Sequence, residues 1–218
     1  MARCIMNIYK PSEGEIFYKG IPICKSKEFR KNRKMLQMTR QMIFQDSASS
    51  LNPRMKIEDI VAEPLRIYSG KGRPGKKEIE KQLELVGLDR SYMEKYPCEL
   101  SGGQRQRVAI ARALSTKPEL IVADEPIASL DVSIQAQMVN LFRKLQKEQG
   151  FSFLFIAHDL SMVEFLCDRT GVMYHGKLVE EGRTQDIFAH PEHEYTKALL
   201  AAVPIPDPRI ERQKGEVL

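Results

Sequence analysis

An apolar run that ends in two carboxylates, Leu120-Ile121-Val122-Ala123-Asp124-Glu125, constrains the fold of this sequence more than any other feature. The run predicts a strand over 119–125 that is buried on both faces, and such strands belong to parallel sheets covered by helices. Ligands of open α/β sheets bind at the carboxyl ends of the strands. We therefore expect Asp124 and Glu125 at a ligand-binding edge, where carboxylates suit a hydrated cation such as Mg²⁺.

A glycine-rich turn, Leu100-Ser101-Gly102-Gly103-Gln104, precedes this strand and opens a predicted helix. Two glycines allow backbone N–H groups to approach a ligand closely, and the positive end of the helix dipole favours an anion. A short loop, Ala128-Ser129-Leu130-Asp131, follows the strand and opens the next predicted helix. A phosphate site beside a magnesium site predicts that the chain binds a nucleotide.

The order of these pieces resembles a known family. LSGGQ at 100–104, VADEP at 122–126 and SLD at 129–131 resemble the signature, Walker B and D-loop motifs of an ABC-type ATPase domain. A capped helix after a Gly-Gly turn, or a strand that ends in a solvated acidic pair, would account for either piece alone but not for the ordered set. The resemblance implies an α/β fold of the P-loop NTPase type, in which helices flank a parallel sheet, with a helical subdomain and small antiparallel β elements.

The resemblance also implies roles for individual residues. Asp124 would hold Mg²⁺ through water, and Glu125 would act as general base. Gln45, in a strand predicted over 42–46, matches the Q-loop glutamine that reaches the magnesium and the attacking water; its amide can both donate and accept. His158, after a buried strand predicted over 151–157, matches the switch histidine at the γ-phosphate. With ATP and Mg²⁺ as cofactors, the expected nucleotide-binding residues are Gln45, Ser101, Gly102, Gly103, Gln104 and Asp131.

We expect one ABC ATPase domain over 1–218, with the Q-loop and helical subdomain at 46–103, the catalytic core at 104–170 and a C-terminal hairpin and tail at 171–218. Hydrophobic periodicity and turn residues predict the smaller elements. These are a hairpin at Lys19-Gly20, a solvated basic helix face over 25–34, helices within 57–88, a helix over 132–149 closed by Gly150, and a hairpin at His175-Gly176.

The 218 residues contain no phosphate-binding loop of the form GxxGxGK followed by Ser or Thr. By resemblance the chain begins inside the helix that follows this loop, so we expect an N-terminally truncated domain whose own ATP site is incomplete. The absent strand would leave neighbouring strands with unpaired backbone groups. A near match at 70–77 is rejected, because Lys77 stands where a hydroxyl must hold magnesium and Pro74 removes a backbone donor.

The segment HPEHEYTKALLAAVPIPDP at 190–208 resembles the C-terminal segment of oligopeptide and dipeptide importer ATPases, and QDSASSLNPRM at 45–55 supports the same family, although Ser47 replaces its usual proline. A metal site at His190 and His193 is disfavoured because no further ligand lies nearby. The resemblance implies a second ABC ATPase subunit, in a homodimer or heterodimer, and transmembrane permease subunits as partners. It places the chain at the cytoplasmic face of the plasma membrane, in keeping with scattered cysteines and no apolar run of membrane-spanning length.

Two other functions stay open. The chain could be a non-catalytic partner that supplies only the signature side of a heterodimeric ATP site. It could instead be a soluble ABC ATPase that acts on DNA or ribosomes, but no charged heptads indicate the long coiled coils of that class. No nucleic-acid partner is expected, because Phe29 is the one aromatic residue in the basic stretch 25–34 and base stacking would be poorly served.

Overall fold

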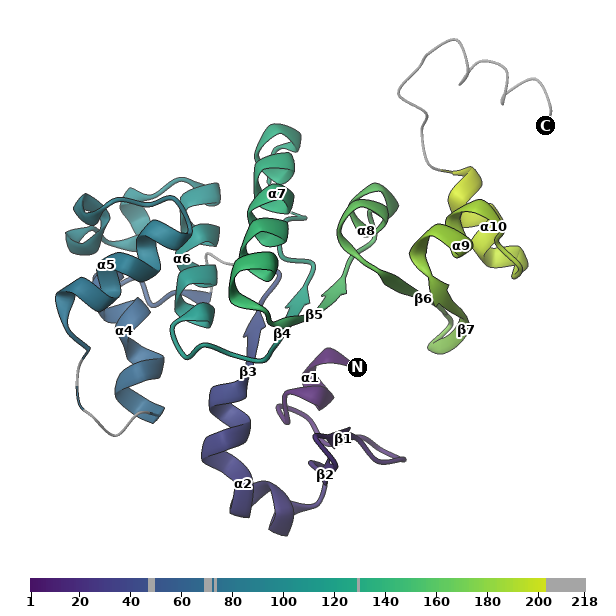
Figure 1. Cartoon of the computed structure of the whole chain (residues 1–218), viewed down its shortest axis with the longest axis horizontal. Helices are drawn as coiled ribbons and strands as arrows, with labels where there is room; N and C mark the ends of the chain where they lie inside the picture. The colour runs from purple at the N-terminus through teal and green to yellow at the C-terminus, as the bar shows by residue number, and fades with distance from the viewer. Residues whose placement is uncertain (47–49, 69–71, 73, 129, 203–218) are drawn as a thin grey trace. The chain divides into compact units, whose positions relative to one another are not determined.

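The computed structural model describes residues 1–46, 50–68, 72, 74–128 and 130–202. It divides into two compact units, Met1–Ile156 and Ala157–Leu218, whose elements are labelled in Figure 1. Four features of the sequence fall wholly or partly outside the described residues: Ser47, the rejected near match at 70–77, Ser129 of the SLD motif, and the end of the segment 190–208.

The first unit holds most of the helices and one parallel sheet. Its elements, in chain order, are α1 (Ala2–Ile5), β1 (Phe17–Tyr18), β2 (Ile21–Pro22), α2 (Ser26–Thr39), β3 (Arg40–Ile43), α4 (Ile57–Tyr68), α5 (Lys76–Leu85), α6 (Gly102–Leu114), β4 (Leu120–Asp124), α7 (Val132–Gln149) and β5 (Ser152–Ile156). The hairpin of β1 and β2 turns at Lys19 and Gly20, as predicted, and both residues have positive φ. The helix closed by Gly150 also has its predicted bounds.

The three longer strands of this unit form a parallel sheet in the order β3-β4-β5. The central strand is buried on both faces, since Ile121, Val122 and Ala123 are each at most 1% exposed. This confirms the predicted parallel sheet. The prediction for β3 was wrong in its bounds, because pairing with β4 begins at Arg40 and ends at Ile43, so Gln45 lies beyond the strand.

Helices cover the two faces of this sheet (Figure 1). On one face, α1 contributes to a hydrophobic cluster that comprises Ala2, Ile5, Met6, Met42, Leu120, Val122, Leu154 and Ile156. On the other face, Phe142 of α7 packs against Phe153 and Phe155, with ring centroids 5.2 and 6.4 Å apart. The side chains of β5 therefore alternate between the two faces, as the pleat of a strand requires.

The strand predicted over 151–157 is confirmed as β5, but the prediction that it is buried was wrong. Ser152 is exposed and residues 153–156 are half-buried. The reason is the place of β5 in the sheet, since among the described strands it pairs with β4 alone and forms an edge. Its outer row of backbone N–H and C=O groups has no strand beside it within the described part of the chain.

A helical region follows β3, as predicted. The helices α4 and α5 pack against α6 and against each other, and the interfaces bury Ile60, Val61, Ile79 and Leu83 to 2% exposure or less. Gly87, with φ +73°, lies just beyond the end of α5. No helix in the described ranges combines the length and the apolar character needed to span a membrane.

The second unit contains an antiparallel hairpin between short helices. Its elements are α8 (Leu160–Leu166), β6 (Arg169–Tyr174), β7 (Lys177–Arg183), α9 (Thr184–Ala189) and α10 (Glu194–Ala201). The hairpin turns at His175-Gly176, as predicted. Glu180 on β7 accepts the N–H groups of Glu192 and His193, at 2.9 and 3.1 Å, and these bonds hold its pKa below the usual range.

Candidate functional site

The two carboxylates of the VADEP segment lie at the carboxyl end of β4. Asp124 is the last residue of the strand and is half-buried. Glu125 lies one residue beyond it in a left-handed conformation, with φ +46°, and its N–H donates to the carbonyl of Ile156 at 2.9 Å. A left-handed conformation costs a residue other than glycine about 1–2 kcal/mol. Such strain often accompanies a functional position.

Gln45 reaches the same place from the neighbouring strand. It follows β3 by two residues, and its Nε2 donates a 2.8 Å hydrogen bond to Oε2 of Glu125. Because β3 and β4 are parallel neighbours, their carboxyl ends meet at one edge, and residues 80 positions apart come into contact. Since the amide nitrogen is directed to Glu125, the amide oxygen of Gln45 is the atom suited to accept from water or bind a cation.

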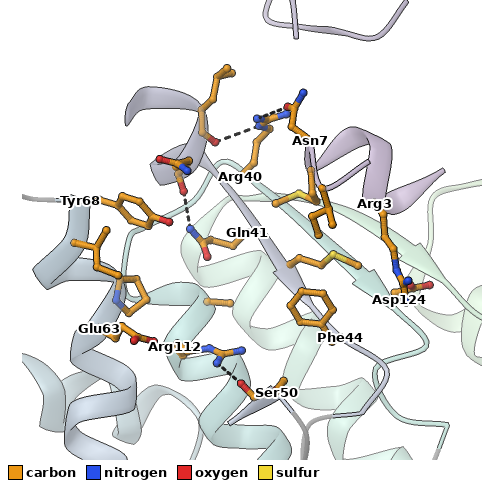
Figure 2. A pocket seen from close by; sticks show the side chains of 18 of the residues that line it. Arg3, Asn7, Arg40, Gln41, Phe44, Ser50, Glu63, Tyr68, Arg112 and Asp124 are labelled. Carbon is orange, nitrogen blue, oxygen red and sulfur yellow. Dashed lines mark hydrogen bonds between the residues drawn. The ribbon is translucent and has the colours of Figure 1, made fainter. Parts of the chain in front are cut away.

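A pocket of about 790 Å³ adjoins this edge of the sheet. Figure 2 shows side chains from α1, α2, β3, α4, α6 and the end of β4 around it. Gln45, Asp46 and Asp124 all line this pocket and carry carboxylate or amide oxygens, the ligand type that Mg²⁺ prefers. These oxygen atoms suit contacts to a magnesium ion through its water molecules, since the described residues contain no group of three acidic, His or Cys side chains placed to hold a metal.

The LSGGQ segment begins α6, as predicted. Ser101 is the exposed N-cap, and its Oγ accepts the N–H of Gln104 at 3.3 Å. The side chain of Gln104 returns the contact, because its Oε1 accepts the N–H of Ser101 at 3.0 Å while its Nε2 donates to the Tyr92 hydroxyl at 2.9 Å. This reciprocal capping box was not predicted, although Ser-x-x-Gln before a helix is its known sequence pattern.

The glycines of LSGGQ have a packing role that the sequence did not predict. A Cβ atom at Gly103 would lie 2.9 Å from Cγ2 of Ile134 on α7, closer than real Cβ contacts. A Cβ at Gly102 would lie 3.4 Å from Cδ2 of Leu130. The first turn of α6 therefore lies directly against the start of α7, and Gly103 allows that approach.

Asp131 and His158 begin two further helices. Asp131 is the exposed N-cap residue of α7, and its carbonyl accepts the N–H groups of Ile134 and Gln135. His158 is exposed, lies two residues beyond β5 and belongs to the second unit. It precedes Asp159, whose carboxylate caps α8 by accepting the N–H of Ser161 at 2.9 Å. The structure thus brings Gln45, Asp124 and Glu125 together and places the remaining candidates at helix starts or beside one.

Arg40 is a further residue of this region that sequence reasoning missed. It is 3% exposed and donates to the carbonyls of Leu36 and Ile5, at 3.2 and 2.5 Å, and to Oδ1 of Asn7 at 3.1 Å. Burial lowers its pKa. These bonds tie the N-terminal segment to β3. No local pattern indicates a buried arginine at a strand start, because its partners lie up to 35 positions away.

Comparison with family models gives two matches along the chain. Residues 1–128 match the family described as "ABC transporter", and residues 179–218 match "Oligopeptide/dipeptide transporter, C-terminal region". Among curated proteins, the "Oligopeptide transport ATP-binding protein OppF" of Streptococcus mutans is 50% identical over 221 residues, which cover 98% of this chain and 70% of that protein. The protein of the same name in Bacillus subtilis is 51% identical, with 97% and 70% covered.

Solved structures of ABC cassettes have a similar fold. A dimeric ATP-binding cassette in a post-hydrolysis state, bound to ADP and Pi, is 28% identical, with a TM-score of 0.72 over 84% of this chain and 78% of that one. CbiO1 from Clostridium perfringens, part of the ABC transporter complex cbiONQ, is 27% identical, with a TM-score of 0.74 over 98% and 80%. With the ABC-type sequence motifs on a layered parallel sheet, the chain belongs to the ABC transporter family and, within it, to the ATP-binding proteins of oligopeptide transport.

Proposed function

We propose that this chain is the ATP-hydrolysing subunit that energises ABC-type import of oligopeptides. The 2.8 Å hydrogen bond from Gln45 to Glu125, beside Asp124, is the observation that carries the proposal. It joins an amide and a carboxylate at the edge of a parallel sheet where ligands of α/β folds bind. The likeness to peptide-transport ATP-binding proteins supports the same function.

The chemistry follows from the properties of these side chains. Glu125 takes a proton from the attacking water as general base, a step that is typically worth 10²–10⁴-fold in rate. Gln45 fixes the direction of the Glu125 carboxylate and offers its own amide oxygen to the water. Asp124 would hold hydrated Mg²⁺, which when bound neutralises charge on the phosphates.

The other candidate residues belong to the same reaction. We infer that the start of α6, Ser101 to Gln104, faces the γ-phosphate of an ATP bound by a second ABC subunit, and that Asp131 lies at that interface. His158 contacts the γ-phosphate of the chain's own nucleotide. Permease subunits in the membrane would be the partners that ATP binding and hydrolysis drive. The dimeric cassette with ADP and Pi supports the pairing of two such domains.

The chain's own site is incomplete within these 218 residues, because they contain no GxxGxGK sequence. The lysine and backbone amides of that loop normally surround the β- and γ-phosphates. We therefore propose that hydrolysis at this site requires a phosphate-binding loop joined upstream of Met1. A chain with that addition is called the loop-extended chain below.

The test is Glu125→Gln in the loop-extended chain, assembled with its permease and partner ATPase subunits. Removal of the base should lower the rate of ATP hydrolysis by about 100-fold or more, because a glutamine cannot accept the proton. Glu84→Gln, which removes an exposed carboxylate from α5, serves as the matched control and should leave the rate within about twofold. Equal rates for the two variants would overturn the assignment of Glu125.

A further inference from the structure

Arg112, on the last turn of α6, closes one side of the pocket and reaches across to the segment that follows β3. Figure 2 shows its guanidinium joined to Ser50, and the Nη1 atom donates a 2.7 Å hydrogen bond to the Ser50 carbonyl. Burial lowers the pKa of Arg112, and the negative charge of Glu63 on α4 opposes that effect. Arg112 is half-buried, and a partly desolvated cation still needs well-placed acceptors, so this contact holds the chain at Ser50.

Ser50 is tied in turn to the neighbour of Gln45. Its N–H donates to the carbonyl of Asp46 at 3.2 Å, and the following residue, Leu51, is 1% exposed. Gln45, the residue before Asp46, donates to Glu125. Arg112 is therefore connected to the Glu125 carboxylate, through the hydrogen bonds of Ser50 and Gln45 and the adjacent positions of Gln45 and Asp46 in the chain.

The other end of α6 is the start of the LSGGQ segment. Ser101 caps the helix, Arg112 lies in its last turn, and the helix has 13 residues, or about 20 Å of length. Because a helix of this length moves as a stiff element, a displacement of its N-terminal end also displaces Arg112. Because Arg112 is hydrogen-bonded to the Ser50 carbonyl, a displacement of Arg112 also changes the position of Ser50.

We propose that Arg112 is a positioning residue for Gln45, so that the contact between Gln45 and Glu125 follows the position of α6. Arg112 acts through Ser50 and Asp46 and touches no reacting group. The consequence for catalysis rests on the function proposed above, in which Glu125 is the base. The mechanical link itself rests only on the contacts among Arg112, Ser50, Asp46 and Gln45.

The same helix provides a matched control. Arg107 also lies on α6, and its Nη1 donates a 2.6 Å hydrogen bond to a backbone carbonyl, that of Val86 just beyond α5. Arg107→Met and Arg112→Met thus remove the same type of bond from the same helix. The first change releases the end of α5, and only the second releases Ser50.

The first readout is independent of activity. The sequence contains no tryptophan, so Phe44→Trp places a single tryptophan beside Gln45, at a position that is 36% exposed and lines the pocket. In the full chain carrying Phe44→Trp, Arg112→Met should shift the emission maximum and increase quenching by acrylamide. Arg107→Met should leave both unchanged. Circular dichroism on each variant confirms that the chain is folded.

The second readout is ATP hydrolysis by the assembled transporter that contains the loop-extended chain. Arg112→Met should lower kcat by about tenfold to a hundredfold, the range that small misplacements of catalytic groups produce, with the KM for ATP within about threefold. Arg112→Lys keeps the positive charge near Glu63 and should recover part of kcat. Arg107→Met should leave kcat within about twofold, whatever its effect on stability.

The outcomes separate the two proposals. If Glu125→Gln leaves hydrolysis unchanged but the tryptophan signal moves with Arg112→Met alone, the proposed function fails and the link stands. If Arg112→Met and Arg107→Met give the same fluorescence and the same kcat, Arg112 is a structural residue only, and the link is overturned. An equal fall in kcat for Arg112→Lys and Arg112→Met, with no change in fluorescence, also overturns it.

Discussion

Gly103 has no room for a side chain, because an added Cβ would lie 2.9 Å from Cγ2 of Ile134. We predict that Gly103→Ala destabilises the chain by about 1–3 kcal/mol, the usual cost of overpacking. Urea unfolding measures the change. Gly102→Ala is the control, since its added methyl would make an ordinary contact with Leu130 and alanine favours the helix. If both variants lose the same stability, close packing of α6 against α7 is not the reason for Gly103.

Cys167 should make the stability of the chain depend on pH. Burial raises the pKa of its thiol from 9.0 to about 11, with a further contribution from Asp168. Between pH 9 and pH 11 the thiol of the folded chain keeps a proton that the thiol of the unfolded chain releases. The contribution of Cys167 to the free energy of unfolding is therefore fully present below pH 9 and is lost as the pH rises towards 11. The stability of the chain should fall across that interval.

Alkylation of Cys167 measures this pKa directly, because the thiolate is the reactive form. The rate with iodoacetamide, followed by mass spectrometry of the peptide that contains Cys167, should keep rising up to about pH 11 in the folded chain. In urea it should level off near the ordinary thiol pKa. A folded chain whose rate levels off at the same pH as the unfolded chain would contradict the effect of burial.

The elements that depend on local sequence signals were predicted well. The helix α7 ends at Gly150, whose left-handed conformation is an ordinary consequence of glycine at a helix end, and the turns lie at Lys19-Gly20 and His175-Gly176 as predicted. The apolar run of β4 gave a central strand because its residues pack on both faces. These features depend on residues close together in the sequence.

Features that depend on distant partners were not predicted. The sequence of β5 resembles a buried strand, but its burial depends on which strands lie beside it, and that is decided by the whole sheet. The hydrogen bond from Arg112 to Ser50 spans 62 positions and leaves no pattern in either segment. Gln45 and Glu125 were expected at strand ends, but neither their hydrogen bond nor the left-handed conformation of Glu125 was predicted.

The edge position of β5 predicts uneven hydrogen exchange. In a parallel strand, successive N–H groups point to opposite sides, so alternate amides among 153–156 should exchange about 100-fold faster than those of β4, which is paired on both sides. Exchange measured at single-residue resolution tests this, with Ile121 to Ala123 as the protected reference. Uniformly slow exchange along β5 would show that another strand covers this edge. The stretch Phe153-Leu154-Phe155-Ile156 has no charge, so we expect edge-to-edge association there if this edge stays uncovered.

For the whole molecule, the prediction concerns ATP binding. The 218-residue chain should bind MgATP at least about 100-fold more weakly than the loop-extended chain, because the backbone amides and lysine of a phosphate-binding loop supply most of the charge stabilisation at the phosphates. Isothermal titration calorimetry with both chains measures the difference. Tight binding by the 218-residue chain would show that another group of donors holds the phosphates.

The same pair of chains distinguishes catalysis by this chain from the role of non-catalytic partner, which the sequence left open. If ATP turnover appears when an intact partner subunit is added to the 218-residue chain and disappears with Ser101→Arg, the chain acts as a non-catalytic partner through the exposed start of α6. Arginine at the N-cap would remove the acceptor for Gln104 and place a bulky side chain at that surface. Turnover that requires the loop-extended chain instead supports catalysis at Glu125.

At Glu125 the residue type that catalysis requires differs from the residue types that its left-handed backbone favours. Asparagine or glycine adopts this conformation more readily, so Glu125→Asn or Glu125→Gly would relax the backbone by about 1 kcal/mol. Either change would also remove the carboxylate that Gln45 contacts. A search for heat-resistant variants that measured folding alone would therefore favour chains without a base, and directed evolution of this protein has to select for turnover and stability together.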